Sequence, residues 1–206
     1  MKKKLLIGLM ASMLMAGAAN ATTNVGGIDF DDNAFVDSLV SSTGSWTYGG
    51  GASSLEDSLV GSDANDFAYC FGRECSVTLK FDDNVAYNGN SYDLAVFELG
   101  TAEEFSVQIG GVTNSYLASS TGYSAGGYDL LVALINLDDF GLAAGDTLSE
   151  LTLFPAPTGA DPADFTVVGA INSRANTAVP EPATMLLFGV GLAGLAAVTD
   201  RPYGAI

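Results

Sequence analysis

Apolar residues at every second position are the feature that most constrains the fold of this chain. They alternate with polar residues over 76–81 and 105–109, which predicts strands with one buried and one solvated face. Residues 94–99 and 130–137 are apolar on both faces, as in strands that are covered on each side. A period of two recurring over separate short segments indicates a protein built from β-sheets.

Turn residues and a shortage of helical segments narrow the fold further. Residues 151–154 and 165–171 are two more short apolar runs, and clusters of glycine, asparagine and proline separate all these segments. Only 53–60 and 138–144 favour short helices. We therefore expect an all-β domain over 22–178, a two-sheet β-sandwich of jelly-roll type. Its length suffices for one domain with a core of its own.

The first residues have the composition of an export signal. Residues 2–4 are lysines, residues 5–18 are apolar, and Ala19 and Ala21 form the small-x-small pattern that signal peptidase accepts. An amphipathic cytosolic helix is the alternative, but the apolar stretch has no polar face. The sequence predicts a signal peptide over 1–21 that is cleaved after Ala21.

A second apolar segment lies near the C-terminus. Residues 183–199 are 17 in number, close to the minimum of about 17–20 residues that span a bilayer core. A buried core helix is the alternative, yet the segment has no polar face, follows two prolines and is followed by Arg201. We predict a single transmembrane helix, with the body outside the inner membrane and Arg201 in the cytoplasm.

The body between these segments is strongly acidic. Residues 22–178 contain 22 Asp and Glu but three basic residues, a net charge of −19. Such a surface repels phosphates, so we expect no nucleic-acid partner. Solubility through charge and a specific acidic site are both open explanations.

The chain has two cysteines, Cys70 and Cys75, separated by four residues. In an oxidising compartment they predict a local disulfide. The enclosed loop is short, so the bond should contribute only about 2 kcal/mol to the free energy of unfolding. A zinc site is a poor alternative without histidine in the chain, and the spacing is not that of a Cys-x-x-Cys redox pair.

The order of features near the C-terminus has a known counterpart. Val179, Pro180, Glu181 and Pro182 directly precede the apolar segment. The region 179–206 resembles the PEP-CTERM sorting tail of exported proteins in Gram-negative bacteria that make exopolysaccharide. That resemblance implies processing by an exosortase-type membrane protease, a transient stay in the inner membrane, and delivery to the cell surface or extracellular matrix. Tails of this family usually end in several basic residues, whereas this one has a single arginine.

The body itself resembles a second group. Residues 79–84, the run from Tyr92 to Gly100 and the closing segment 163–171 are similar to exosortase-sorted surface proteins with a galactose-binding-like jelly roll. The likeness extends from about 66 to 172 and rests on an Asp-Leu-x-Val-Phe-Glu-x-Gly pattern. It implies a jelly-roll fold that binds glycans or calcium.

The sequence assigns no certain cofactor, and a structural calcium ion is the candidate. Calcium takes about six to eight oxygen ligands from carboxylates, amides and carbonyls. The acidic loops and the strands beside them supply such groups, which we expect to converge. The candidate ligands are Asp82, Asp83, Asn84, Asp93, Glu98 and Asp164. Solvated loop acids are the alternative explanation.

Catalysis has less support in the sequence, and we assign no catalytic residues. Without histidine, a Ser-His-Asp or Cys-His arrangement is excluded. A glycosidase needs only two carboxyl groups, which Glu98, Glu103, Glu104 and Asp164 can supply. However, enzymes of this kind usually carry several aromatic residues for sugar stacking, and Trp46 is the only tryptophan. We predict a protein that is not an enzyme.

Trp46 and Tyr48 are candidates for glycan stacking, since an exposed ring face packs on a pyranose. The alternative, which strand alternation favours, places both rings on one buried face.

Together these observations predict an exported cell-surface or matrix protein with a structural or adhesive role and extracellular polysaccharide as its ligand. Two alternatives remain: a carboxylate-dependent glycan hydrolase sorted by the same route, and an unprocessed membrane-tethered periplasmic domain.

Overall fold

A computed structural model describes residues 22–156 and 161–176 of this protein. It confirms the all-β prediction: 52% of the described residues are in strands and 6% are in helices. The predicted signal peptide (1–21) and the sorting tail (179–206) with its segment 183–199 lie outside the described residues. Within 22–156 and 161–176, no helix has the length and apolarity needed to cross a membrane.

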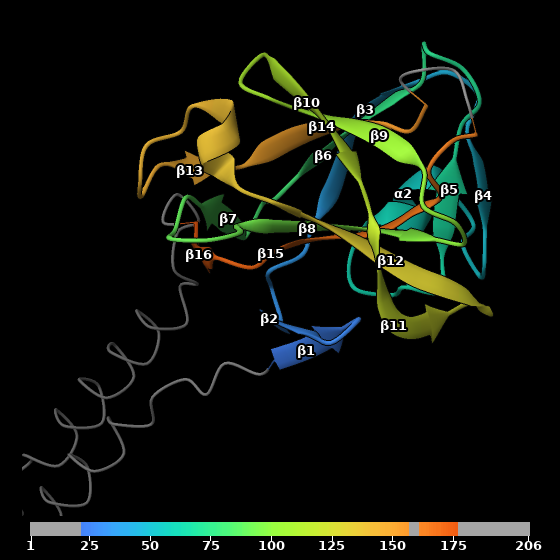
Figure 1. The fold of residues 1–206 in the computed structure, drawn as a ribbon, viewed down its shortest axis with the longest axis horizontal. Coiled ribbons are helices and arrows are strands. Elements are labelled where there is room, and N and C mark those ends of the chain that lie inside the picture. The colour runs from blue at the N-terminus through green and yellow to red at the C-terminus, as the bar shows by residue number, and fades with distance from the viewer. Residues whose placement is uncertain (1–21, 157–160, 177–206) are drawn as a thin grey trace, which may run out of the picture. The chain divides into compact units, whose positions relative to one another are not determined.

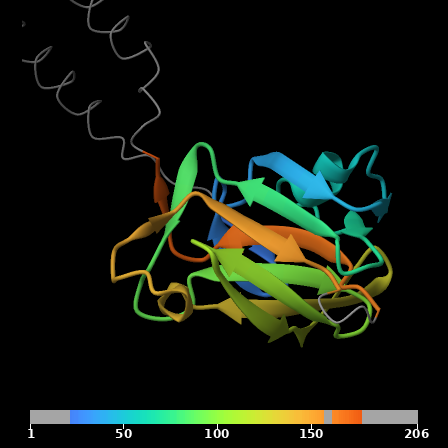
Figure 2. The ribbon, with the colours of Figure 1, turned by 90° about the horizontal axis from the view of Figure 1, so that it is seen from above.

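Two antiparallel sheets form the body of the fold, and Figure 2 shows their strands in stacked layers. The five-stranded sheet has the order β10 (Val112–Leu117), β9 (Glu104–Ile109), β14 (Glu150–Phe154), β6 (Ser76–Lys80), β3 (Ser38–Thr43). The six-stranded sheet has the order β11 (Ser119–Ala125), β12 (Tyr128–Ile135), β8 (Leu94–Leu99), β15 (Phe165–Ala170), β5 (Phe67–Tyr69), β4 (Thr47–Gly49). Every run of period-two or apolar residues that predicted a strand overlaps one of these strands, although β12 ends at Ile135 and Leu137 belongs to a 3-10 helix.

Smaller elements complete the fold (Figure 1). One is a hairpin of β1 (Thr22–Val25) and β2 (Ile28–Asp31), and another is a small sheet of β13 (Thr147–Leu148), β7 (Asn84–Tyr87) and β16 (Ser173–Ala175). Both predicted helical segments exist, as α2 (Leu55–Leu59) and the 3-10 helix η1 (Leu137–Phe140).

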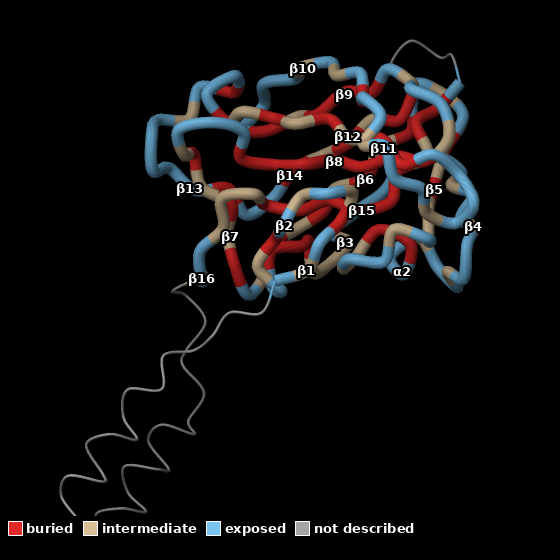
Figure 3. Tube along the Cα trace, turned by 60° about the horizontal axis from the view of Figure 1, so that its bottom comes forward, coloured by how far each residue is buried: buried red, intermediate tan, exposed pale blue. Residues whose placement is uncertain are grey.

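The main core lies between the two sheets. Val77 and Leu79 of β6 and Phe105 and Val107 of β9 face Leu94 and other residues of the six-stranded sheet, and all are buried. Polar residues occupy the other face of β6, where the Thr78 hydroxyl lies 2.9 Å from that of Thr152 on β14. The predicted solvated face is therefore present, and Figure 3 shows the buried segments along β6, β14, β8 and β15.

A second core covers the opposite face of β8. Ala95, Phe97 and Leu99 belong to it, whereas Leu94 and Val96 belong to the main core. This parity explains why 94–99 is apolar at nearly every position: the central strand is covered on both faces.

The β1–β2 hairpin supplies the cover for this second core and lies below β8 in Figure 1. Phe30 is 1% exposed and its ring meets the Phe97 ring at 6.2 Å. A Cβ added at Gly169 of β15 would lie 2.7 Å from the Phe30 ring. Since only glycine leaves room for this ring, Gly169 is part of the docking surface of the hairpin.

Asp93 joins three segments at the start of β8. It is completely buried, and its carboxylate accepts hydrogen bonds from the backbone N–H of Gly89 (2.8 Å), that of Leu137 (2.8 Å) and the side-chain amide of Asn172 (2.8 Å). The loop that follows β7, the start of η1 and the segment that follows β15 therefore meet on one carboxylate. A buried charge with three donors is tolerated because its lone pairs are satisfied.

Replacing Asp93 by alanine should destabilise the protein strongly. The substitution leaves one buried donor, Leu137 N–H, and two part-buried donors, from Gly89 and Asn172, without an acceptor, and each unsatisfied buried group costs about 1–3 kcal/mol. We expect the free energy of unfolding to fall by at least about 3 kcal/mol in urea denaturation. The matched control is Asp129→Ala, at an exposed position, which should change stability by less than about 0.5 kcal/mol. Equal effects of the two substitutions would contradict this role of Asp93.

Candidate functional site

A cleft of about 430 Å³ lies at one end of the six-stranded sheet, where β8 ends and β12 and β15 begin. Edge strands β4 and β5 contribute to its wall. We call it the aromatic cleft. Its lining residues are Thr47, Tyr48, Gly49, Phe67, Tyr69, Phe71, Glu103, Tyr128, Asp161, Pro162 and Asp164. Its volume lies within the range of about 300–1,000 Å³ that is typical of ligand sites.

A row of aromatic rings forms one part of the lining. Tyr128 meets Phe67 edge-on at 6.0 Å, Phe67 stacks on Tyr69 at 6.4 Å, and Tyr69 meets Phe71 edge-on at 5.6 Å. Phe67, Tyr69 and Phe71 occupy alternate positions of one extended segment, so their side chains project to the same side. Four rings in sequence provide a continuous apolar surface beside the acidic groups.

Several of these rings are exposed to an unusual degree. Phe71 is 65% exposed, Tyr128 53% and Tyr48 44%. A large ring left in water contributes nothing to the core, and a group of such rings indicates a surface that binds something.

The Cys70–Cys75 disulfide is present and confirms the sequence prediction. It closes the loop that directly carries Phe71, and Cys70 and Cys75 are both about 1% exposed. A Cβ at Gly44 would lie within 2.8 Å of both sulfur atoms, so β3 approaches the bond closely. The disulfide therefore anchors the end of the aromatic row to the body of the fold.

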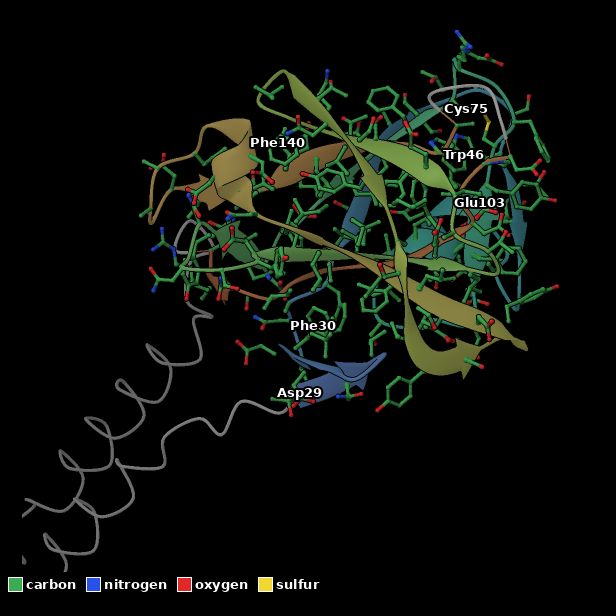
Figure 4. All side chains as sticks on the ribbon, in the orientation of Figure 1. Asp29, Phe30, Trp46, Cys75, Glu103 and Phe140 are labelled. Atoms are coloured by element: carbon green, nitrogen blue, oxygen red, sulfur yellow. A yellow bond between two sulfur atoms is a disulfide. The ribbon has the colours of Figure 1, made fainter. Side chains whose placement is uncertain are left out.

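Three acids, Glu103, Asp161 and Asp164, line the cleft opposite this row. Asp164 lies directly before β15, and its backbone carbonyl accepts a hydrogen bond from Leu99 N–H at 3.0 Å. Burial raises the pKa of Asp164 to about 6, and the nearby charge of Glu103 adds to this effect. Figure 4 shows Glu103 at the same end of the domain as Trp46 and Cys75, with Phe140 of η1 at the other end.

Glu98 lies behind these acids in the main core. On β8 it is paired with Leu131 of β12 and Phe165 of β15, both of which are core residues, and it is completely buried. Its Oε1 accepts a hydrogen bond from Glu103 N–H at 3.2 Å, and Oε2 has no partner among the described residues. Burial raises the pKa of Glu98 to about 8, and the charges of Glu103 and Asp164 act in the same direction. At neutral pH this carboxyl group is therefore mostly protonated.

The two predicted stacking residues have different positions. Tyr48 lines the aromatic cleft, whereas Trp46 does not. Trp46 is partly buried against the main core, and its indole N–H donates a hydrogen bond to the Thr43 carbonyl at 2.8 Å. Stacking on a glycan remains a prediction for Tyr48, and Trp46 has the packing role that was the alternative for both.

The six predicted calcium ligands do not converge. Asp82 pairs with Lys80 and accepts from the Ser38 hydroxyl at 2.7 Å, and the N–H of Asp83 points to the Asp37 carboxylate at 3.4 Å. These groups lie at the end of β6, away from Asp164.

The other four candidates are divided among three further places. Asn84 is buried and its amide has no partner among the described residues, Asp93 is satisfied by three donors, and Glu98 and Asp164 adjoin the aromatic cleft. In the described ranges, no group of three or more His, Cys, Asp or Glu is arranged to hold a metal ion. The expected convergence is wrong because strand β8 separates Asp93 from Glu98 by its full length. Calcium binding by this chain stays a prediction without a site.

Most of the residues that line the cleft were not identified from the sequence. Four carboxyl groups were proposed as a set: the structure brings Glu98, Glu103 and Asp164 together, whereas Glu104 is exposed on β9 and does not line the cleft. Phe67, Tyr69 and Phe71 were not singled out, although three aromatic residues at alternate positions beside a cysteine are a readable signal. Tyr128 and Asp161 have no such signal, because only the folded chain brings them to this place.

Comparison with known proteins identifies the C-terminal region. Residues 178–201 match the PEP-CTERM protein-sorting motif. The chain thus carries a sorting signal that implies export, a membrane-anchored C-terminus and processing by an exosortase. The predicted motif Val179 to Pro182 lies within this match. No match was found among curated proteins.

Solved structures give a weaker likeness. An exo-β-1,3-galactanase from Phanerochaete chrysosporium with galactose is 17% identical with a TM-score of 0.40, and covers 72% of this chain. Two variants of that enzyme with β-1,3-galactotriose are 16% identical with TM-scores of 0.39 and 0.40. The chain spans about a third of the length of these proteins, 32% in each case.

The buried Glu98 should make stability depend on pH. Its pKa is about 8 in the folded protein and 4.5 as the reference for an exposed group. Between these values the folded state holds a proton that the unfolded state has released, so stability is complete below about pH 4.5 and falls as pH rises to about 8. At about 1.4 kcal/mol per pH unit, the loss should be roughly 3–5 kcal/mol.

Urea denaturation at pH 5, 7 and 9 measures this effect. In the Glu98→Gln variant, the free energy of unfolding should fall much less as pH rises. The Glu104→Gln variant, changed at an exposed position, should show the same fall as the unchanged protein. Asp164, with its pKa raised from 3.8 to about 6, accounts for a smaller decline at the acidic end of the range. A Glu98→Gln curve parallel to that of the unchanged protein would show that Glu98 is ionised in the fold.

Proposed function

We propose that this is an exported cell-surface or matrix protein that binds glycan in the aromatic cleft and has a structural or adhesive role. The observation that carries the proposal is the row of rings from Tyr128 to Phe71 beside the three acids of one cleft. Aromatic faces pack on the apolar face of a pyranose, and carboxylates accept hydrogen bonds from its hydroxyl groups. The domain that presents this site is, in the proposal, a β-sandwich of the jelly-roll type.

The sorting signal supports the surface location. In the proposed route, residues 183–199 hold the protein in the inner membrane, and processing occurs at Pro180, Glu181 and Pro182. Described structure ends at Asn176, so cleavage there leaves all strands of the domain intact. The released domain is acidic and contains a disulfide, which are both compatible with an oxidising exterior.

A second candidate is a carboxylate-dependent glycan hydrolase. Its supporting observation is that Glu98 and Asp164 adjoin Glu103 and both have raised pKa values, as an acid in such a mechanism requires. However, Glu98 is fully buried and does not line the cleft, so it cannot reach a glycosidic oxygen in this conformation. We therefore propose binding without hydrolysis.

Removing rings from the cleft should weaken glycan binding. We expect the Tyr48→Ala and Phe71→Ala variants to lose at least about fivefold in affinity for the best ligand of a glycan array, because a stacked ring contributes about 1 kcal/mol or more. The control is Tyr92→Ala, which removes a ring that is 50% exposed outside the cleft. An equal loss for Tyr92→Ala would place the binding surface elsewhere.

Hydrolysis is tested with the same ligands. We expect no new reducing ends from a polysaccharide panel. Release of sugars that is lost in Glu98→Gln or Asp164→Asn, with circular dichroism unchanged, would establish the hydrolase instead.

Processing should produce a shortened C-terminus. Mass spectrometry of the protein recovered from cell surface or medium is expected to show an end near Val179, because cleavage at the motif removes the apolar segment. Replacing Pro180 and Pro182 by alanine should abolish this product, whereas Tyr203→Ala, outside the matched residues, should not. Recovery of chains that end at Ile206 would instead indicate an unprocessed, membrane-tethered domain.

A further inference from the structure

We propose that the ligand of the aromatic cleft is a polysaccharide with free amino groups, such as a de-N-acetylated hexosamine polymer. The proposal rests on the proposed function and specifies its ligand class. Its basis is a cleft that combines a row of aromatic rings with carboxyl groups and contains no opposing positive charge.

The charges around the cleft exclude one class of glycan. Glu103, Asp161 and Asp164 line it, and none of its described lining residues is basic. Two of the three basic residues of the body are engaged at other places: Lys80 pairs with Asp82 on the five-stranded sheet, and Arg174 of β16 donates to the Gly145 carbonyl at 3.1 Å. Uronate-containing or sulfated chains would meet like charge from the three lining acids, which disfavours them, although Arg73 belongs to the Cys70–Cys75 loop that carries Phe71.

The aromatic row favours a cation over a neutral sugar. An ammonium group within about 6 Å of a ring centroid is attracted by the ring face, and the attraction increases when water is excluded. Phe67 and Tyr69 stack with their ring planes 14° from parallel and their centroids 6.4 Å apart, and both rings belong to the cleft lining. An amino sugar can place its ring on this surface while its ammonium group points to the acids, a combination that a neutral sugar cannot use.

Glu98 gives independent support for a cation at this position. Its carboxyl group is completely buried, its Oε2 has no partner among the described residues, and Glu103 and Asp164 lie close enough to influence its ionisation. Burying an unsatisfied carboxyl group beside two other acids costs stability, so its retention needs an explanation. A cation bound against Glu103 and Asp164 would favour ionisation of these groups and offset that cost.

This coupling gives the proposal a readout beyond affinity. Glu103 and Asp164 are the titratable groups whose charges act on the buried Glu98 carboxyl, and the charge of Glu103 also acts on Asp164. A bound ammonium group lowers the pKa of Asp164 and of Glu98, so binding at pH 6–7 should release protons. Isothermal titration in buffers of different ionisation enthalpy counts these protons.

The experiment compares three hexasaccharides of the same length on the processed protein: a glucosamine oligomer with free amines, its fully N-acetylated counterpart, and an oligouronate. At pH 6.5 we expect the free-amine oligomer to bind at least tenfold more tightly than the N-acetylated one, with proton release, and the oligouronate not to bind. The double variant Asp161→Asn/Asp164→Asn should lose at least tenfold for the amine and change little for the neutral oligomer.

A control variant that removes two acids outside the cleft distinguishes binding at this site from general attraction of a cation to an acidic protein. Asp32→Asn/Glu150→Asn removes two exposed acids outside the cleft lining and should leave the affinity within twofold. Hexalysine should bind at least tenfold more weakly than the free-amine oligomer, since it has no pyranose face.

The possible failures are distinct. Equal or tighter binding of the N-acetylated oligomer overturns the amino-sugar proposal and leaves glycan binding standing. An equal loss of affinity in the two double variants also overturns the amino-sugar proposal, because binding would then be due to general electrostatic attraction. Failure of all three oligomers, together with a glycan array that shows no ligand, overturns the proposed function as well.

Discussion

Burial of both faces of β8 is the constraint on which the rest of the structure depends. Leu94 and Val96 face the five-stranded sheet, while Phe97 and its neighbours face the β1–β2 hairpin. Fully burying one such side chain contributes about 1.5–3 kcal/mol, so the strand is a major source of stability. Two-sided burial also requires a cover on the outer face, which Phe30 provides by packing over Gly169. The hairpin is thus an integral layer of the fold.

The same strand places an acid where burial is costly. Glu98 has the parity of Leu94 and Val96, so its carboxyl group enters the main core beneath the aromatic cleft. One end of β8 carries Asp93, whose three donors make it a structural junction, and the other end carries Glu98, whose Oε2 has no such partner among the described residues. Two buried carboxyl groups on one strand therefore have opposite consequences: the first holds loops together, and the second connects stability with the charge state of the cleft.

The sorting tail and the cleft define different parts of the protein's function. The motif over 178–201 concerns where the protein is delivered, while the rings and acids of the cleft concern what it meets after delivery. Described strands end at Ala175, before the motif begins, so every described strand precedes the residues that match the motif. In the proposal, the disulfide anchors the end of the aromatic row before a glycan binds, so ordering these rings costs little on binding.

The sequence by itself determined the strands, the disulfide and the sorting motif, because each of these depends on neighbours in the chain: the period of two over 76–81, the five-residue separation of the cysteines, and the Pro-Glu-Pro element. Tertiary structure alone decided which acids meet. Asp93 and Glu98 were expected at one calcium site, yet the length of β8 separates them. A bulge in β15 between Phe165 and Val168 shifts the parity of that strand, which no local pattern reveals. The cleft joins Tyr48, Glu103, Tyr128 and Asp161 from distant segments, and such contacts depend on how the sheets pair and pack.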